Sequence, residues 1–149
     1  MSLSTTEIYA DVNYNYQAIV IGGAYSVDKF YRLNRGIHWF PDEQPSPETK
    51  DCVESVLVDS GWQVDVVLSH TCPAKYIPTE AFLPGIDQST VDNSTEKWLD
   101  DIENTLKCRH WLCGHWHNDK RIDKMHFLRY SFKIRYLCTV YRGQRIEDA

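Results

Sequence analysis

The sequence predicts an α/β fold, and three of its features lead to this expectation. Apolar runs rich in β-branched residues stop abruptly at a histidine or a glycine, as buried strands do. Segments with apolar residues at helical spacing alternate with these runs along the chain. Hydrophobic residues make up 42% and aromatic residues 13% of the chain, which excludes a disordered protein. We therefore expect residues 1–149 to form a single domain with a sheet and flanking helices.

The first expected strand covers residues 14–21. Its side chains alternate between two faces, and both faces become more apolar toward the end of the segment. A glycine pair ends the strand, and we expect Gly22 and Gly23 to form a tight turn rather than to contact a substrate. Ser26 is then placed to cap a short helix that stops at Gly36. Residues 1–9 show no firm pattern.

A helix that covers the sheet is predicted after Ser46, because a serine at the N-cap and Pro47 at the first helical position form a typical helix start. Its apolar stripe consists of Cys52, Val53, Val56 and Leu57. The next strand runs from Val64 to His70 and completes a unit of helix and strand. Residues 73–91 form a long irregular connection, which either shapes a substrate pocket or is a mere insertion.

The last third contains one helix and two strands. Asn93 and Glu96 are spaced as a capping pair for a helix that reaches about Lys107. A strand over residues 109–114 follows directly, and residues 128–136 alternate as a half-buried strand with a basic outer face. Ten of the sixteen lysines and arginines lie between positions 107 and 145. A basic surface could attract phosphorylated substrates, but a solvated strand face explains these charges more simply.

Three histidines follow two of the predicted strands. His115 and His117 are spaced to point to the same side of an extended segment, with Gly114 allowing the backbone to bend before them. His70 ends the other strand. Ligands of open α/β sheets gather at the carboxyl ends of strands, so these histidines are expected to meet there. Three imidazoles suit a divalent transition metal.

Two alternatives remain open for these residues. His115 and His117 could be ordinary surface histidines of a turn, since the pattern of two histidines around one residue is weak by itself. Cys108 and Cys113 could instead bind a structural zinc ion together with His115. The five cysteines are odd in number and lie in apolar segments, which favours reduced, buried thiols over disulfides.

Four stretches together resemble the C-terminal half of a calcineurin-like metallophosphoesterase of the bacterial and phage type. The stretches are residues 20–29, 39–46 (WFPDEQPS), 69–73 (SHTCP) and 113–119 (CGHWHND). The resemblance implies the second half of an αββα sandwich, with a mixed sheet and flanking helices. It also implies that His70 and His115 bind one metal ion and that His117 binds a second one. Manganese, iron, zinc or nickel are the metals that such a site would hold.

The sequence departs from this family in an important way. Members begin with an Asp-x-His motif, a Gly-Asp motif and a Gly-Asn-His-Glu motif, and this chain contains none of the three. The bridging carboxylate and the histidine that donates a proton are thus missing, so the residues 1–149 would be a partial domain that binds at most one ion weakly. The resemblance implies hydrolysis of phosphomonoesters or phosphodiesters, with little activity of this chain alone. The alternative is a non-catalytic remnant that serves as an interaction module.

Partners and compartment follow from simpler features. No run of about 20 apolar residues could cross a membrane, and no basic residue precedes Lys29 as in a signal peptide, so we expect a cytoplasmic protein. The expected substrate is a phosphorylated small molecule or a phosphodiester, whereas nucleic acid is an unlikely but not excluded partner. Apolar faces on residues 14–20 and 128–136 suggest that the chain forms a homodimer or binds a complementing N-terminal half.

Overall fold

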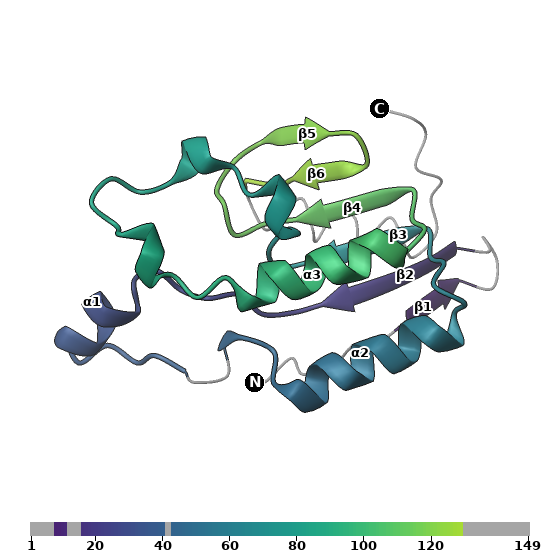
Figure 1. Ribbon diagram of the computed structural model, residues 1–149, viewed down its shortest axis with the longest axis horizontal. Coiled ribbons are helices and arrows are strands. Elements are labelled where there is room, and N and C mark those ends of the chain that lie inside the picture. The colour runs from purple at the N-terminus through teal and green to yellow at the C-terminus, as the bar shows by residue number, and fades with distance from the viewer. Residues whose placement is uncertain (1–7, 12–15, 41–42, 130–149) are drawn as a thin grey trace.

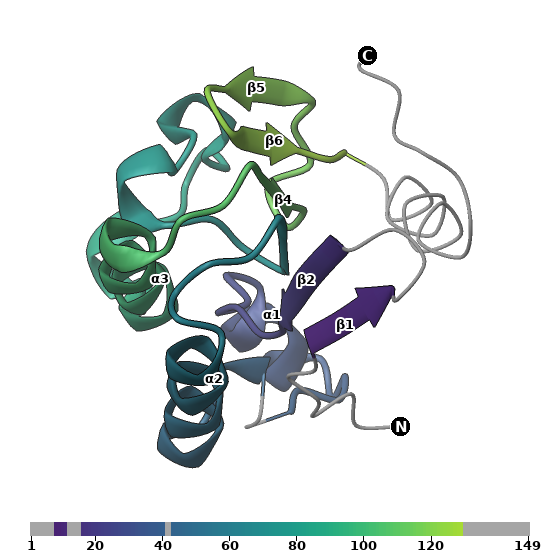
Figure 2. The same ribbon diagram turned by 90° about the vertical axis from the view of Figure 1, so that its right-hand side faces the viewer.

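A computed structural model describes residues 8–11, 16–40 and 43–129 of the chain. These residues form a six-stranded sheet in the order β1-β2-β3-β4-β6-β5, with helices α2 and α3 packed on the same side of it (Figures 1 and 2). The strands are β1 (Ile8–Asp11), β2 (Tyr16–Ile21), β3 (Val66–Ser69), β4 (His110–Cys113), β5 (Lys120–Ile122) and β6 (Met125–Phe127). The α-helices are α1 (Lys29–Asn34), α2 (Pro47–Asp59) and α3 (Ser94–Thr105). The α/β class predicted from the sequence is confirmed.

The central strands of the sheet are parallel, whereas both edges are antiparallel. β2 pairs with β3, β3 with β4 and β4 with β6 in parallel. β1 and β5 are antiparallel edge strands that pair with β2 and β6. The carboxyl ends of β2, β3 and β4 therefore lie at one edge of the sheet, at the left in Figure 1, and this is where ligands of such sheets collect.

The main core lies between the sheet and helices α2 and α3. Trp111 on β4 is fully buried in it and donates a hydrogen bond from its indole Nε1 to the hydroxyl of Ser69, 2.7 Å away. A bonded indole nitrogen allows the large ring to be buried without a penalty for an unpaired donor. The opposite face of the sheet carries a smaller buried cluster, which contains Ala18, Val66, Leu68 and Leu112.

Helix α2 begins as the sequence predicts. The hydroxyl of Ser46 accepts a hydrogen bond from the backbone N–H of Thr49 at 3.2 Å, and Pro47 occupies the first turn. Val53 and Leu57 are buried against the core, but Cys52 is exposed, so it does not belong to the apolar stripe. The helical stripe is thus narrower than the sequence indicates.

The predicted capping pair of α3 is wrong. Asn93 is the N-cap residue, but its side chain makes no capping hydrogen bond. The carboxylate of Asp92 accepts a bond from the N–H of Ser94 instead, at 2.9 Å. Glu96 turns into the interior, where its Oε1 accepts a hydrogen bond from the hydroxyl of Thr71. A tertiary contact has therefore displaced the local one that the spacing predicts.

Several predicted boundaries differ from the structure. Ser26 does not cap α1; its hydroxyl donates to the carboxylate of Asp28, the N-cap residue. The irregular connection after Pro73 contains three short 3-10 helices, η2 (Ala74–Tyr76), η3 (Thr79–Ala81) and η4 (Gln88–Thr90). The strands β1, β5 and β6 were not predicted. Residues 130–136 of the predicted last strand and residues 14–15 of the first lie outside the described residues.

None of the helices in the described part of the chain is both long enough and apolar enough to cross a membrane.

Candidate metal centre

His70 and His115 meet at the carboxyl ends of β3 and β4, as the sequence predicts. The Nε2 atom of His70 lies 3.3 Å from the Nδ1 atom of His115, and the ring centroids are 5.2 Å apart. Backbone hydrogen bonds fix both segments: the N–H of His70 donates to the carbonyl of Ile21 at 3.0 Å, and that of Gly114 donates to the carbonyl of His70 at 3.1 Å. The parallel ladder is thus continued beyond the strands into the site.

The backbone of the Gly-His-x-His segment is not extended, contrary to the expectation. His115 has a φ of 65° and His117 a φ of 49°, both in the left-handed region, whereas Gly114 does not have a positive φ. The N–H of Trp116 donates to the carbonyl of Gly114 at 2.7 Å, which closes a tight turn. The histidines, not the glycine, adopt the unusual conformation. Non-glycine residues held in such strained conformations cluster at functional sites.

The distance between the two imidazole nitrogens fits a shared metal ion. Two nitrogens that bind one ion at ~2.0 to 2.1 Å in tetrahedral geometry lie about 3.3 to 3.4 Å apart. The observed separation is 3.3 Å. The same distance also suits a hydrogen bond between two neutral imidazoles, in which one ring donates and the other accepts. The pair is therefore compatible with a bound ion but does not require one.

Both imidazoles are held in the neutral form that metal binding needs. Desolvation, aided by the nearby His70 and His117, lowers the pKa of His115 to about 4. Desolvation also lowers the pKa of His70, and the negative charge of Glu43 partly opposes this shift. Neutral imidazoles present a free lone pair, so at pH 7 neither ring has to lose a proton before it binds an ion.

Glu43 is a site residue to which the sequence argument assigned no role. The backbone N–H of Ala24 donates to the carbonyl of Glu43 at 2.8 Å, which holds this segment against the loop after β2. Gly23 makes the close approach possible: it has a φ of 97°, and a Cβ atom there would lie 2.7 Å from the Cδ of Pro45. The side chain of Glu43 also lies 3.8 Å from Arg32. The glycine therefore has a structural role, as expected.

A third ligand is not in place among the described residues. No group of three or more His, Cys, Asp or Glu side chains in this part of the chain has the geometry to hold a metal ion. His117 acts on His115 through its charge but is exposed and does not complete the pair. The alternative site of Cys108, Cys113 and His115 is not supported either, because these three side chains are not among any such group in the described residues. The described cysteines are free, and Cys113 contacts Met125 instead.

A second pair of histidines lies at the other end of β4. The Nδ1 atom of His110 and the Nε2 atom of His126 are also 3.3 Å apart, with ring centroids 5.3 Å apart. His110 begins β4 and therefore lies at the end of this strand away from His115, and the pair was not predicted because the short strand that carries His126 was not expected. Desolvation lowers the pKa of His126, and the nearby charge of Arg121 adds to this shift. A cation beside this pair disfavours a metal ion there.

A cleft of about 440 Å³ opens beside the first histidine pair. His115, Trp116 and His117 form part of its lining, and residues 77–92 of the long connection form much of the rest. The ion pair of Lys120 with Glu80, at 2.6 Å, and the hydrogen bond of Gln44 to Asp92, at 2.9 Å, anchor this connection. Of the two roles considered for the connection, the described structure matches the shaping of a pocket.

Two buried polar atoms beside this cleft have no hydrogen-bond partner, the Oε2 of Glu96 and the Nε1 of Trp116. Glu96 is only 4% exposed, and desolvation raises the pKa of its carboxyl group despite the hydrogen bond from Thr71. The arrangement thus combines a pair of neutral imidazoles with an adjoining, partly apolar cleft. Comparisons with protein-family models, with curated proteins and with solved structures find no match for this chain.

Proposed function

We propose that this chain supplies the histidine ligands of a metal-dependent phosphoester hydrolase. The observation that carries the proposal is the contact between His70 and His115 at the carboxyl ends of two neighbouring parallel strands, 3.3 Å from nitrogen to nitrogen. In this proposal the described sheet and helices correspond to the C-terminal half of the αββα sandwich of calcineurin-like metallophosphoesterases. The four sequence stretches that resemble this family support it, and two of them contain His70 and His115.

Each part of the proposed site has a role that its surroundings support. In the proposed site His70 and His115 bind one divalent ion. His117, which lies in the same turn as His115, binds a second ion. Divalent ions in such a site activate water and stabilise charge on the phosphoryl oxygens. Glu43 places a negative charge near His70, which favours a cation there. The adjoining cleft receives the organic part of the phosphoester.

The proposed site is incomplete among the described residues of this chain. A two-metal centre needs carboxylates that bridge the ions and offset their charge, and the described residues offer no third ligand in place. We propose that a segment with the Asp-x-His and Gly-Asn-His-Glu motifs completes it from another polypeptide or another part of a longer chain. The chain alone should hydrolyse an aryl phosphate with manganese poorly or not at all.

Metal content tests the proposal directly, and the second histidine pair provides a matched control. The purified chain is dialysed against manganese or zinc, and the bound metal is measured by mass spectrometry. His115→Ala should abolish binding, whereas His126→Ala, which disrupts a pair with the same 3.3 Å separation, should not. If His126→Ala abolished binding and His115→Ala did not, the metal would lie at the other end of β4 and the proposal would be wrong. Robust manganese-dependent turnover that disappears in His115→Ala would instead show a complete site.

The second candidate function is a non-catalytic interaction module. It is favoured by exposed apolar side chains on and after α1, which are Phe30, Tyr31, Leu33, Ile37 and Phe40, each 47 to 62% exposed. Exposed apolar side chains that are gathered in one short segment are a common feature of protein interfaces. A chain that binds no metal at micromolar concentrations, but whose self-association depends on these residues, would favour the module over the hydrolase.

A further inference from the structure

The cleft beside the histidine pair has a composition that the proposed chemistry does not require. Hydrolysis needs a place for the phosphoryl group, but this cleft extends away from His115 between the loop after β2, the start of α3 and the long connection. Its lining is mostly apolar where residues 77–91 form it. A cavity of about 440 Å³ falls in the range of roughly 300 to 1,000 Å³ that small-molecule sites occupy.

Aromatic rings connect the cleft with the histidine pair. The ring of Phe82 lies 6.2 Å from that of Trp116, tilted by 35°. Trp116 in turn meets His115 edge to face at 5.1 Å. A planar ligand that lies against such side chains gains contact area on its flat faces at little conformational cost. The walls of the cleft therefore favour a flat ring over a flexible or branched group.

Two unpaired polar atoms border this apolar cleft. The indole Nε1 of Trp116 is a donor without an acceptor, and the Oε2 of Glu96 has no donor, although its other oxygen is bonded to Thr71. Buried polar atoms nearly always have a partner, so two such atoms beside one cleft call for an explanation. A ligand that offers one acceptor and one donor would satisfy both. Apolar rings and aliphatic groups would leave them unpaired.

We propose that the cleft binds a planar nitrogen heterocycle, such as the base of a nucleoside phosphoester, as the organic part of the substrate. This inference rests on the proposed function, because the histidine pair then lies where the phosphoryl group would be. Ring nitrogens of the heterocycle accept from Trp116, and an amino group on its edge donates to Glu96. Because both protein atoms are buried beneath the cleft surface, small rotations of the two side chains accompany binding.

The test separates the cleft from the metal site by using a ligand without phosphate. Adenosine is titrated into the metal-free chain in the presence of a chelator, and binding is followed by saturation-transfer NMR and by chemical shifts of the Trp116 indole. Saturation should reach the base protons, and Phe82→Ala should weaken binding at least tenfold. Phe30→Ala is the matched control, because Phe30 is exposed on α1 and does not line the cleft.

Glu96→Gln examines the polar part of the proposal. The amide oxygen can still accept from Thr71, which leaves the amide nitrogen in the position of Oε2 and removes the acceptor there. Adenosine binding should fall at least fivefold, with an unchanged circular dichroism spectrum as evidence of folding. Equal binding of adenosine to the variant and to the parent chain would overturn the proposal. So would binding of cyclohexanol or ribose as tightly as adenosine.

His70→Ala keeps the two proposals distinguishable, because His70 does not line the cleft. This variant should lose metal but still bind adenosine. If the parent chain binds adenosine but no metal, the hydrolase proposal fails and the heterocycle site stands. If the parent chain binds metal but no adenosine, the heterocycle site is wrong and the metal site stands.

Discussion

The hydroxyl of Thr71 donates a hydrogen bond to the Oε1 atom of Glu96 over 2.8 Å, and both side chains are buried. This bond ties the residue after His70 to the first turn of α3. It therefore couples the position of a candidate metal ligand to a helix on the covered face of the sheet. Oε2 of the same carboxylate has no hydrogen-bond partner. The hydroxyl of Thr71 is therefore the only side-chain donor to Glu96 among the described residues.

Thr71→Val should destabilise the chain by about 1 to 3 kcal/mol, because it leaves both oxygens of a buried carboxylate without a side-chain donor. Valine has nearly the shape of threonine, so packing changes little. Urea denaturation followed by circular dichroism measures the change. Thr79→Val, at an exposed position in η3, is the matched control and should stay within about 0.5 kcal/mol. Equal effects of the two substitutions would contradict the importance of the bond.

Glu96→Gln should stabilise the chain at pH 8. The ordinary pKa of a glutamate carboxyl group is 4.5, and burial raises the pKa of Glu96 above this value in the folded state. As the pH rises above 4.5, the folded state therefore binds more protons than the unfolded state. The contribution of Glu96 is therefore most favourable below its unfolded pKa and is lost as the pH rises through the folded pKa. Glutamine cannot ionise, and the advantage of the variant should grow from pH 4 to pH 8. A difference that shrinks over this range would refute the buried ionisation.

Gly23→Ala should cost about 2 to 4 kcal/mol, the sum of left-handed strain and overpacking. The new Cβ would lie 2.7 Å from Pro45 and 3.0 Å from the carbonyl oxygen of Glu43. The substitution should also move Glu43 away from the site and weaken metal binding. Gly61→Ala is the control, since Gly61 has a φ of 65° but nothing lies within 4 Å of the added atom. Gly61→Ala should therefore lower the free energy of unfolding only by the left-handed strain, without overpacking.

The elements that the sequence predicts well are long or end at a distinctive residue. Helices α2 and α3 each contain at least three turns, and β3 and β4 end beside His70 and Gly114. The convergence of two strand ends was enough to predict the contact of His70 with His115. The bend expected at Gly114 was nevertheless wrong, because the left-handed φ values belong to His115 and His117. Periodicity alone does not reveal a residue that is held in a strained conformation.

The short strands and the tertiary hydrogen bond of Glu96 could not be predicted, for physical reasons. β5 and β6 have three residues each, too few for an alternating pattern, and the turn between them contains Asp123 and Lys124 rather than the usual Asp-Gly. His126 was missed with them. Glu96 was assigned to a helix cap because its spacing fits one, whereas the structure brings it to Thr71, 25 positions away. Only the fold can decide between a local partner and a distant one.

The stability of the metal-free chain should fall as the pH decreases from 7 to 4, partly because of His115. Its folded pKa is about 4, whereas an unfolded histidine takes up a proton near 6.5. In this range the unfolded state binds more protons, so acid favours unfolding by up to ~3 kcal/mol, and by less where solvent reaches the ring. NMR titration of the ring proton of His115 measures its pKa directly. A midpoint near 6.5 would contradict the desolvated site. His115→Asn, which tolerates a positive φ, should flatten the dependence of stability on pH.

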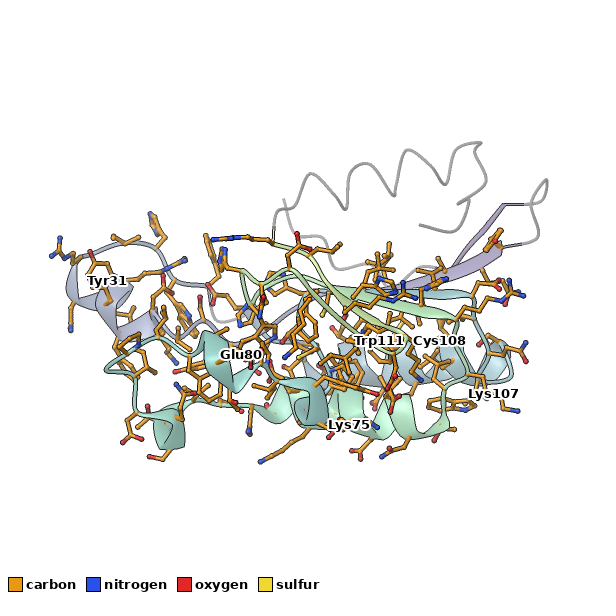
Figure 3. The ribbon with its side chains drawn as sticks, turned by 90° about the horizontal axis from the view of Figure 1, so that it is seen from above. Tyr31, Lys75, Glu80, Lys107, Cys108 and Trp111 are labelled. Atoms are coloured by element: carbon orange, nitrogen blue, oxygen red, sulfur yellow. The ribbon has the colours of Figure 1, made fainter. Side chains whose placement is uncertain are left out.

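Self-association should depend on α1 and the segment after it rather than on the strand faces expected from the sequence. Ala18, on one of those faces, is only 2% exposed, and residues 130–136 of the other face lie outside the described residues. The large exposed apolar side chains are instead concentrated between Phe30 and Phe40, where α1 extends to one end of the molecule, marked by Tyr31 in Figure 3. Such a patch is favourably covered by a second copy.

A chain with Phe30 and Leu33 both changed to serine should therefore sediment as a smaller species than the parent chain at micromolar concentration. The two side chains are 62% and 50% exposed, so the substitutions remove apolar surface without opening the core, and the unfolding midpoint should change little. Val58→Ser is the control, because Val58 is 60% exposed but lies on α2, apart from this segment. If the parent chain is a stable monomer, or if the control variant dissociates equally, α1 does not mediate association.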